Sequence, residues 1–215
     1  MVARALRNGA AALFVTLGTV TAVSADQITI AALGDSLTQG YGLPPAQGFV
    51  PQLQDWLRAE GLEVEVLNAG VSGDTTAGGL ARIDWTLTPE VDALIVALGG
   101  NDLLRGIDPA TSRANLSGIL ERAGGLPVLL VGMEAPGNYG PEFKQAFDAM
   151  YPELAEQFGA TLAPSFFEGF EMEEADLAAA RDLMQADGIH PNAEGVARIV
   201  EALGPRVLAL VRPEG

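Results

Sequence analysis

The 215-residue chain has no cysteine and only one histidine. Without cysteine there are no disulfides, no thiolate nucleophile and no thiolate ligands for a metal. A single histidine further disfavours a transition-metal centre, and Asp102 and Asp187 do not belong to a loop rich in the oxygen ligands that calcium prefers. The glycine patterns typical of nucleotide-binding loops are also missing. We therefore expect neither a metal nor a cofactor.

Basic residues are scarce as well. Lysine and arginine together number 12 against 28 acidic residues, which gives a formal net charge of −16 at pH 7. A surface of this sign repels phosphate backbones and anionic lipids, so we expect no nucleic-acid partner. Aromatic residues make up only 6% of the chain, whereas 48% of it is hydrophobic. This composition predicts a single globular domain with an aliphatic core.

The longest hydrophobic stretch of the chain lies at its N-terminus. Arg4 and Arg7 precede the apolar residues 10–23, and Val23-Ser24-Ala25 matches the small-x-small pattern of a cleavage site. We expect residues 1–25 to be a secretory signal peptide and residues 26–215 to be the exported, periplasmic or secreted domain. The alternative is an N-terminal membrane anchor that is never removed. No later segment is long and apolar enough to span a bilayer.

Short β-prone runs alternate with longer amphipathic segments after residue 26. The expected strands cover residues 28–33, 64–67, 93–98, 128–132 and 161–163, and the expected helices cover about 47–60, 75–85, 110–123, 142–158 and 192–210. This alternation predicts an α/β fold whose parallel sheet is covered by helices on both faces. Within the last helix, Gly204-Pro205 predicts either a kink or the first turn of a new helix.

Three polar motifs each follow one of the first three expected strands. They are Gly34-Asp35-Ser36, Ser72-Gly73-Asp74 and Gly99-Gly100-Asn101-Asp102. Parallel strands linked by helices all end at the same edge of their sheet. We therefore expect these three motifs, although distant in sequence, to gather in one cleft.

Ser36 and the single histidine, His190, are candidates for nucleophilic catalysis. A serine nucleophile needs an imidazole to accept its proton and a carboxylate to orient that imidazole, and Asp187 lies three residues before His190. The plainer interpretations are that Ser36 is only a helix N-cap, and that Asp187-Gly188 is a turn beside a surface histidine.

Gly73 and Asn101 are candidates for stabilising a negatively charged oxygen. Attack on an ester carbonyl places charge on that oxygen, and preset hydrogen-bond donors stabilise it. A glycine allows close approach of its backbone N–H, and asparagine donates through its side-chain amide. Taken separately, each of the two motifs could also be a simple turn or helix cap.

These motifs resemble those of the SGNH (GDSL) hydrolases. The four blocks of that family appear in order as Gly34-Asp35-Ser36-Leu37, the glycine of Ser72-Gly73-Asp74, Gly99-Gly100-Asn101-Asp102 and Asp187-Gly188-Ile189-His190. The resemblance looks closest to the periplasmic bacterial branch of acyl-CoA thioesterases, lysophospholipases and arylesterases. Further matching segments are Asn68-Ala69-Gly70, Leu80-Ala81-Arg82, Leu103-Leu104-Arg105-Gly106 and Asn138-Tyr139-Gly140.

The resemblance implies a three-layer α/β/α sandwich, flavodoxin-like, with a five-stranded parallel sheet. It assigns Ser36 as nucleophile, His190 as general base and Asp187 as the orienting carboxylate. It also places the backbone N–H groups of Ser36 and Gly73 and the side chain of Asn101 in the oxyanion hole. Residues 133–137, Met-Glu-Ala-Pro-Gly, depart from the thioesterase-like members at a loop that borders the acyl groove.

The expected activity is hydrolysis of a small-molecule acyl ester through an acyl-enzyme. The expected substrates are aryl or alkyl esters and lysophospholipids, with acyl thioesters ranked after them because acyl-CoA is cytosolic. A carbohydrate O-deacetylase of the same family is an alternative. A non-catalytic module that binds a lipid or glycan is another, although such a module would be expected to lack one of the three catalytic residues.

Overall fold

A parallel sheet forms the middle layer of the molecule. The computed structural model describes residues 27–170 and 181–212. The sheet has five parallel strands, as expected, and their order is β2-β1-β3-β4-β5. The strands are β1 (Ile28–Gly34), β2 (Val64–Gly70), β3 (Ala93–Ala97), β4 (Val128–Val131) and β5 (Thr161–Ala163). All five residues of β3 are buried, which is the pattern of a central strand covered on both faces.

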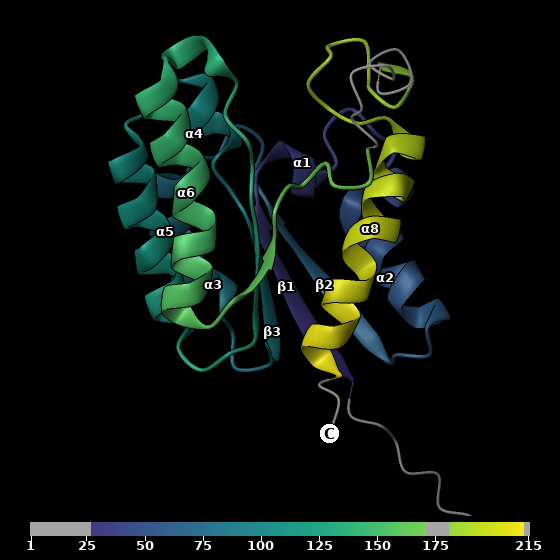
Figure 1. The fold of residues 1–215 in the computed structure, drawn as a ribbon. Coiled ribbons are helices and arrows are strands. Elements are labelled where there is room, and N and C mark those ends of the chain that lie inside the picture. The colour runs from purple at the N-terminus through teal and green to yellow at the C-terminus, as the bar shows by residue number, and fades with distance from the viewer. Residues whose placement is uncertain (1–26, 171–180, 213–215) are drawn as a thin grey trace, which may run out of the picture.

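Helices cover both faces of this sheet (Figure 1). The helices are α1 (Ser36–Gln39), α2 (Phe49–Ala59), α3 (Thr76–Thr86), α4 (Gly100–Leu104), α5 (Pro109–Ala123), α6 (Pro141–Phe158) and α8 (Ala193–Val211), with short 3-10 turns η1 (Pro45–Gln47) and η2 (Gly137–Tyr139). Helices α2 and α8 lie on one face, and α3, α5 and α6 lie on the other. The expected three-layer α/β/α sandwich is therefore confirmed.

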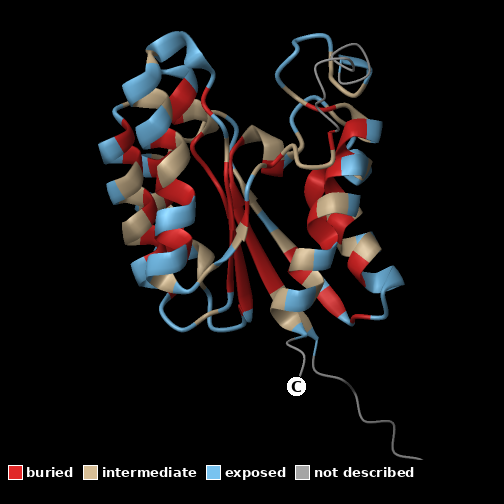
Figure 2. Ribbon diagram, viewed as in Figure 1, coloured by how far each residue is buried: buried red, intermediate tan, exposed pale blue. Residues whose placement is uncertain are grey.

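The sheet separates two aliphatic cores. One core packs Leu53 of α2 and Leu203 of α8 against the sheet, and the other packs Leu116 of α5 and Phe147 of α6 against the opposite face. Figure 2 shows this pattern as buried residues on the strands and on the inner sides of the helices, with exposed residues on their outer sides. The amphipathic periodicity of the long helices is thus matched by burial on one side of each.

The elements differ from the sequence predictions mainly at their ends. Strand β2 continues to Gly70, beyond the predicted end at residue 67, because backbone pairing with β1 extends to Gly34 after the apolar pattern has stopped. Helices α1 and α4 were not predicted, since four or five residues are too few to show a helical period. Pro205 lies inside the continuous helix α8, on its exposed side, so it does not begin a new helix.

The strand order places a crevice above the middle of the sheet. Strand β1 leads to α2 on one face of the sheet, whereas its neighbour β3 leads to α5 on the opposite face. Open parallel sheets bind ligands outside the carboxyl ends of their strands at such a point. Gly34, the last residue of β1, leads directly into the candidate nucleophile Ser36.

Candidate active site

Ser36 is the first residue of helix α1. The helix N-cap is its neighbour Asp35, whose Oδ1 accepts a hydrogen bond from the backbone N–H of Leu37 at 2.9 Å. The simple interpretation of Ser36 as the N-cap is therefore wrong. Because Asp35 satisfies the helix end, the Ser36 hydroxyl is free to make a different contact.

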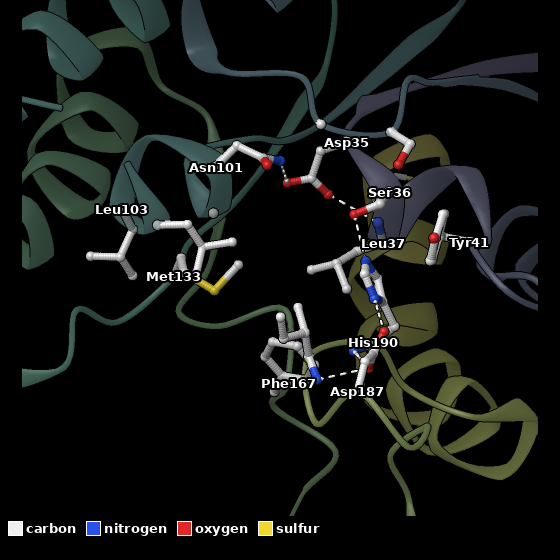
Figure 3. A pocket seen from close by; sticks show the side chains of 15 residues that line it. Asp35, Ser36, Leu37, Tyr41, Asn101, Leu103, Met133, Phe167, Asp187 and His190 are labelled. Atoms are coloured by element: carbon white, nitrogen blue, oxygen red, sulfur yellow. Dashed lines mark hydrogen bonds and ion pairs between the residues drawn. The ribbon is translucent and has the colours of Figure 1, made fainter. Parts of the chain in front are cut away.

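The Ser36 hydroxyl meets the imidazole of His190. The distance between Ser36 Oγ and His190 Nε2 is 2.8 Å, across 154 positions of sequence. His190 Nδ1 lies 2.7 Å from Asp187 Oδ2 (Figure 3). If Nδ1 carries a proton and donates it to the carboxylate, Nε2 can accept the proton of Ser36. The structure thus brings all three predicted residues into one hydrogen-bonded chain.

Asp187 also forms the turn that carries His190. Its Oδ1 accepts the backbone N–H groups of Ile189 and His190, and Gly188 supplies the left-handed backbone at φ +66°. The hydrogen bond with the His190 ring, followed by these two backbone bonds, lowers the pKa of Asp187 to about 2. The turn and the catalytic interpretation of this motif are therefore compatible, because one carboxylate serves both.

The loop before helix α8 holds His190 in place. Asn192 caps α8 by accepting the N–H groups of Glu194 and Gly195, and Gln185 N–H donates to the carbonyl of His190 at 2.8 Å. The ring of Tyr41 lies against the imidazole, with the two ring centroids 4.7 Å apart. Sequence reasoning missed Tyr41, since no spacing rule connects it with His190.

Gly73 and Asn101 line the same cleft as Ser36. Gly73 has a φ of +81°, which favours glycine, and its carbonyl accepts a hydrogen bond from Arg105 at 2.7 Å. Asn101 lies near the start of α4 and donates through Nδ2 to Asp35 Oδ2 at 3.2 Å. The expected gathering of the three strand-end motifs is confirmed.

Asp35 was missed as a member of the site. Its side chain is 3% exposed and hydrogen-bonds both Leu37 and Asn101. Burial raises the pKa of Asp35 to about 6, and the two hydrogen bonds offset part of that effect. No local pattern in the sequence indicated this role, because the contact with Asn101 spans 66 positions.

Two polar clusters support the loops around the cleft. Arg82 donates to Asp74 at 2.7 Å and to the carbonyls of Gly34 and Ala69 at 2.9 and 2.7 Å, so one guanidinium joins the ends of β1 and β2. Buried Asp102 accepts the backbone N–H of Thr76 and the hydroxyl of Ser112, each at 2.8 Å. These contacts anchor the segments that carry Ser36, Gly73 and Asn101.

The cleft above Ser36 has a volume of about 420 Å³. Its apolar wall consists of Leu37, Tyr41, Leu103, Leu104, Met133, Phe167 and Ile189. In Figure 3, Leu103 and Met133 lie on the side of the cleft away from His190. An apolar wall beside one serine, one imidazole and hydrogen-bond donors suits an ester with a hydrocarbon acyl group.

No metal site accompanies this cleft in the described part of the chain. Within residues 27–170 and 181–212, no group of three or more His, Cys, Asp or Glu side chains is arranged to hold a metal ion.

Comparison with known proteins identifies the family. Residues 32–198 match the model of the GDSL-like lipase/acylhydrolase family, so the match includes every candidate residue from Ser36 to His190. The chain belongs to this family. Its members are serine hydrolases, and the protein is accordingly an SGNH-type hydrolase of the esterase group.

Similarity to individual GDSL hydrolases extends over most of the chain. The chain is 42% identical to esterase TesA of Pseudomonas aeruginosa, over 85% of this chain and 89% of the relative. It is 37% identical to thioesterase 1/protease 1/lysophospholipase L1 of Escherichia coli K12 over 93% and 91%. Among solved structures, the SGNH-hydrolase family esterase AlinE4 is 45% identical with a TM-score of 0.69, covering 88% of this chain and 99% of that one.

Proposed function

We propose that the protein is an exported ester hydrolase in which Ser36, His190 and Asp187 carry the reaction. The observation that supports this most directly is the 2.8 Å distance between Ser36 Oγ and His190 Nε2. Without proton acceptance by imidazole, a serine hydroxyl is a weak nucleophile at neutral pH. The 2.7 Å contact between His190 and Asp187 provides the orientation that the imidazole needs.

The proposed reaction has two chemical steps. Ser36 Oγ attacks the ester carbonyl while His190 Nε2 takes the hydroxyl proton, and the C–O bond to the alcohol breaks as His190 returns that proton to the leaving oxygen. A water molecule then attacks the acyl-Ser36 ester, giving its proton to His190, which passes it back to Ser36 as the acid leaves. The backbone N–H groups of Ser36 and Gly73 and the Asn101 amide stabilise the oxyanion in both steps.

The apolar wall of the cleft favours hydrocarbon acyl groups. We propose aryl and alkyl esters and lysophospholipids as substrates, with short- and medium-chain acyl thioesters as a further group. The support comes from side chains such as Leu37, Met133 and Phe167, which offer hydrophobic contact but no hydrogen bonds to a sugar. Carbohydrate O-deacetylation is therefore the less favoured activity.

The decisive experiment replaces Ser36 by alanine. We expect Ser36→Ala to reduce kcat on p-nitrophenyl butyrate by at least about a thousandfold, because the nucleophile and the acyl-enzyme are lost. Labelling by phenylmethylsulfonyl fluoride, followed by mass spectrometry, should locate the modified residue at Ser36. The control is Ser117→Ala, which removes a serine of helix α5 and should keep the wild-type rate. A Ser36→Ala protein that folds and retains substantial turnover would contradict the proposed nucleophile.

A further inference from the structure

A second cavity shares a lining residue with the cleft. The cleft above Ser36 has a volume of about 420 Å³, and the second cavity has a volume of about 170 Å³. Among the described residues, Met133, which follows strand β4, is the one that lines both of them. The two cavities therefore adjoin at Met133.

The second cavity can accept hydrocarbon. Tyr151, Leu162 and Pro164 contribute apolar surface to it. The carboxylate of Asp148 also lines it, but that carboxylate already accepts the Ala135 N–H at 2.8 Å and the Lys144 ammonium at 2.7 Å. The Asp148 charge is thus paired and hydrogen-bonded, and Glu134, the other acidic residue of the lining, is exposed to solvent. An acyl chain can therefore contact the apolar side chains of the cavity without desolvating a buried, unpaired carboxylate.

The backbone close to Met133 is fixed. Two residues further on, Ala135 donates its N–H to Asp148 and accepts the Lys144 ammonium through its carbonyl, also at 2.7 Å. The side chain of Met133 extends toward the start of α4, where a Cβ added to Gly100 would lie 3.4 Å from Met133 Cε. The loop thus holds a flexible thioether at a defined place between the two cavities.

We propose that Met133 sets the upper limit of acyl-chain length by closing the cleft toward the second cavity. This inference rests on the proposed ester hydrolase function and concerns the substrate class of that site. An acyl chain bound with its carbonyl at Ser36 and its tail toward Met133 fills the cleft and then meets the thioether. Chains too long for the cleft lose hydrophobic contact or displace Met133. Removing the side chain joins the cavities and gives the tail further apolar surface.

The test is the dependence of kcat/KM on acyl length, measured with p-nitrophenyl esters from acetate to palmitate. We expect Met133→Ala to move the maximum by two or more carbons toward longer chains. Each additional methylene that becomes buried should raise kcat/KM about fourfold, so esters two carbons beyond the wild-type maximum should gain about tenfold or more. Activity on the acetate ester, whose single methyl group adds no chain to the second cavity, is the reference to which each length profile is normalised.

Two further variants show whether a shift toward longer chains comes from joining the two cavities or only from enlarging one of them. Leu162→Ala enlarges only the second cavity, which Met133 still closes, so it should leave the position of the maximum unchanged. Leu162→Phe places a larger ring at the second cavity; combined with Met133→Ala it should restore the wild-type length profile. Thermal melting of each variant confirms that it is folded, and Met133→Val provides a smaller truncation that should give a smaller shift in the same direction.

The outcomes distinguish this inference from the proposed function. An unchanged maximum in folded Met133→Ala, an equal shift in Leu162→Ala, or a shift that Leu162→Phe does not reverse would overturn the role of Met133. Ser36-dependent hydrolysis of short esters would in each case leave the proposed function intact. If the wild-type protein shows no Ser36-dependent hydrolysis of any ester, the proposed function itself fails.

Discussion

Asp35 connects the nucleophile turn with the proposed oxyanion hole. Oδ1 of its carboxylate caps helix α1 and Oδ2 accepts the Asn101 amide. An ionised carboxylate only accepts hydrogen bonds, so it selects the orientation in which Asn101 presents its NH₂ group rather than its carbonyl to Asp35. The second hydrogen of that NH₂ group then remains available for an oxyanion. We therefore propose that Asp35 is a positioning residue that acts through Asn101.

Replacing Asp35 by asparagine isolates this role. The substituted side chain keeps the volume and can still cap the helix through its carbonyl oxygen, but its NH₂ group cannot accept from Asn101. We expect Asp35→Asn to lower kcat about tenfold or more with little change in KM, and Asn101→Ala to lower kcat on the order of a hundredfold. The double variant should be no slower than Asn101→Ala alone. An equal loss from Asp35→Asn in both backgrounds would indicate a merely structural role.

The same substitution should change how stability depends on pH. The pKa of Asp35 is about 6 in the folded protein, against an ordinary value of 3.8 for an exposed carboxyl. Between these values the folded protein binds more protons than the unfolded chain, so this group stabilises the fold below pH 4, and its contribution falls as pH rises through 6. The contribution lost is on the order of 3 kcal/mol at neutral pH.

Melting temperatures at pH 4, 5, 6 and 7 test this expectation. The melting temperature of Asp35→Asn minus that of the wild type should increase as the pH rises, since the variant carries no carboxylate at position 35 to ionise. Asp187, whose pKa is lowered to about 2, titrates in both proteins and therefore cancels in the difference. A difference that stays constant over this range would show that Asp35 does not titrate there.

Helix α4 depends on buried hydrogen bonds more than on its own length. It has only five residues, Gly100–Leu104, and one of them is the fully buried Asp102. Such a short helix is not stable by itself. The carboxylate of Asp102 joins it to Thr76 of α3 and to Ser112 of α5, so two longer helices determine where Asn101 lies.

A matched pair of serine variants on α5 measures the strength of this anchor. Ser112→Ala removes a buried hydroxyl that donates to Asp102, whereas Ser117→Ala removes a hydroxyl whose contact with Glu121 is exposed. We expect Ser112→Ala to lower the free energy of unfolding by about 1.5–3 kcal/mol, the range for a hydrogen bond to a charged group. Ser117→Ala should change it by less than about 0.5 kcal/mol. Urea unfolding gives both values, and equal values would exclude a special role for the Asp102 cluster.

The amphipathic and apolar patterns predicted the long elements well but the short ones poorly. All five strands and the five longer helices follow from alternation and from runs such as Ala93–Ala97. In contrast, α1 and α4 contain the residues with the greatest chemical interest and were not predicted. Their backbone is determined by contacts such as Asp35 with Leu37 and Asp102 with Thr76, which no periodicity encodes.

The whole chain is acidic, and removal of the expected signal peptide would make it more so. Residues 1–25 contain two arginines and no acidic residue, so their loss changes the formal net charge from −16 to −18. These residues lie outside the part of the chain that the structure describes. None of the helices in the described part has the length and hydrophobicity that a membrane crossing requires. Export therefore remains a proposal based on the signal-like sequence.

Expression of the full chain in a Gram-negative host tests this proposal. We expect the periplasmic fraction to contain a protein whose N-terminus is Asp26, because cleavage follows Ala25. Mass spectrometry of the intact protein identifies the terminus directly, and Ala25→Arg should block processing as a control. Full-length protein retained in the membrane fraction would support the alternative of an uncleaved anchor, and full-length protein in the cytoplasm would contradict export.

The sequence by itself determined the alternation of strands and helices and the placement of three polar motifs at one edge of a parallel sheet. Both follow from local patterns, since burial on two faces gives apolar runs and parallel strands must end together. Only the tertiary structure decided that His190 reaches Ser36, that Asp35 hydrogen-bonds Asn101, and that Met133 lines two cavities. The two hydrogen bonds join residues 154 and 66 positions apart. Such long-range contacts, and the cavities left between elements, are determined by side-chain packing and not by local periodicity.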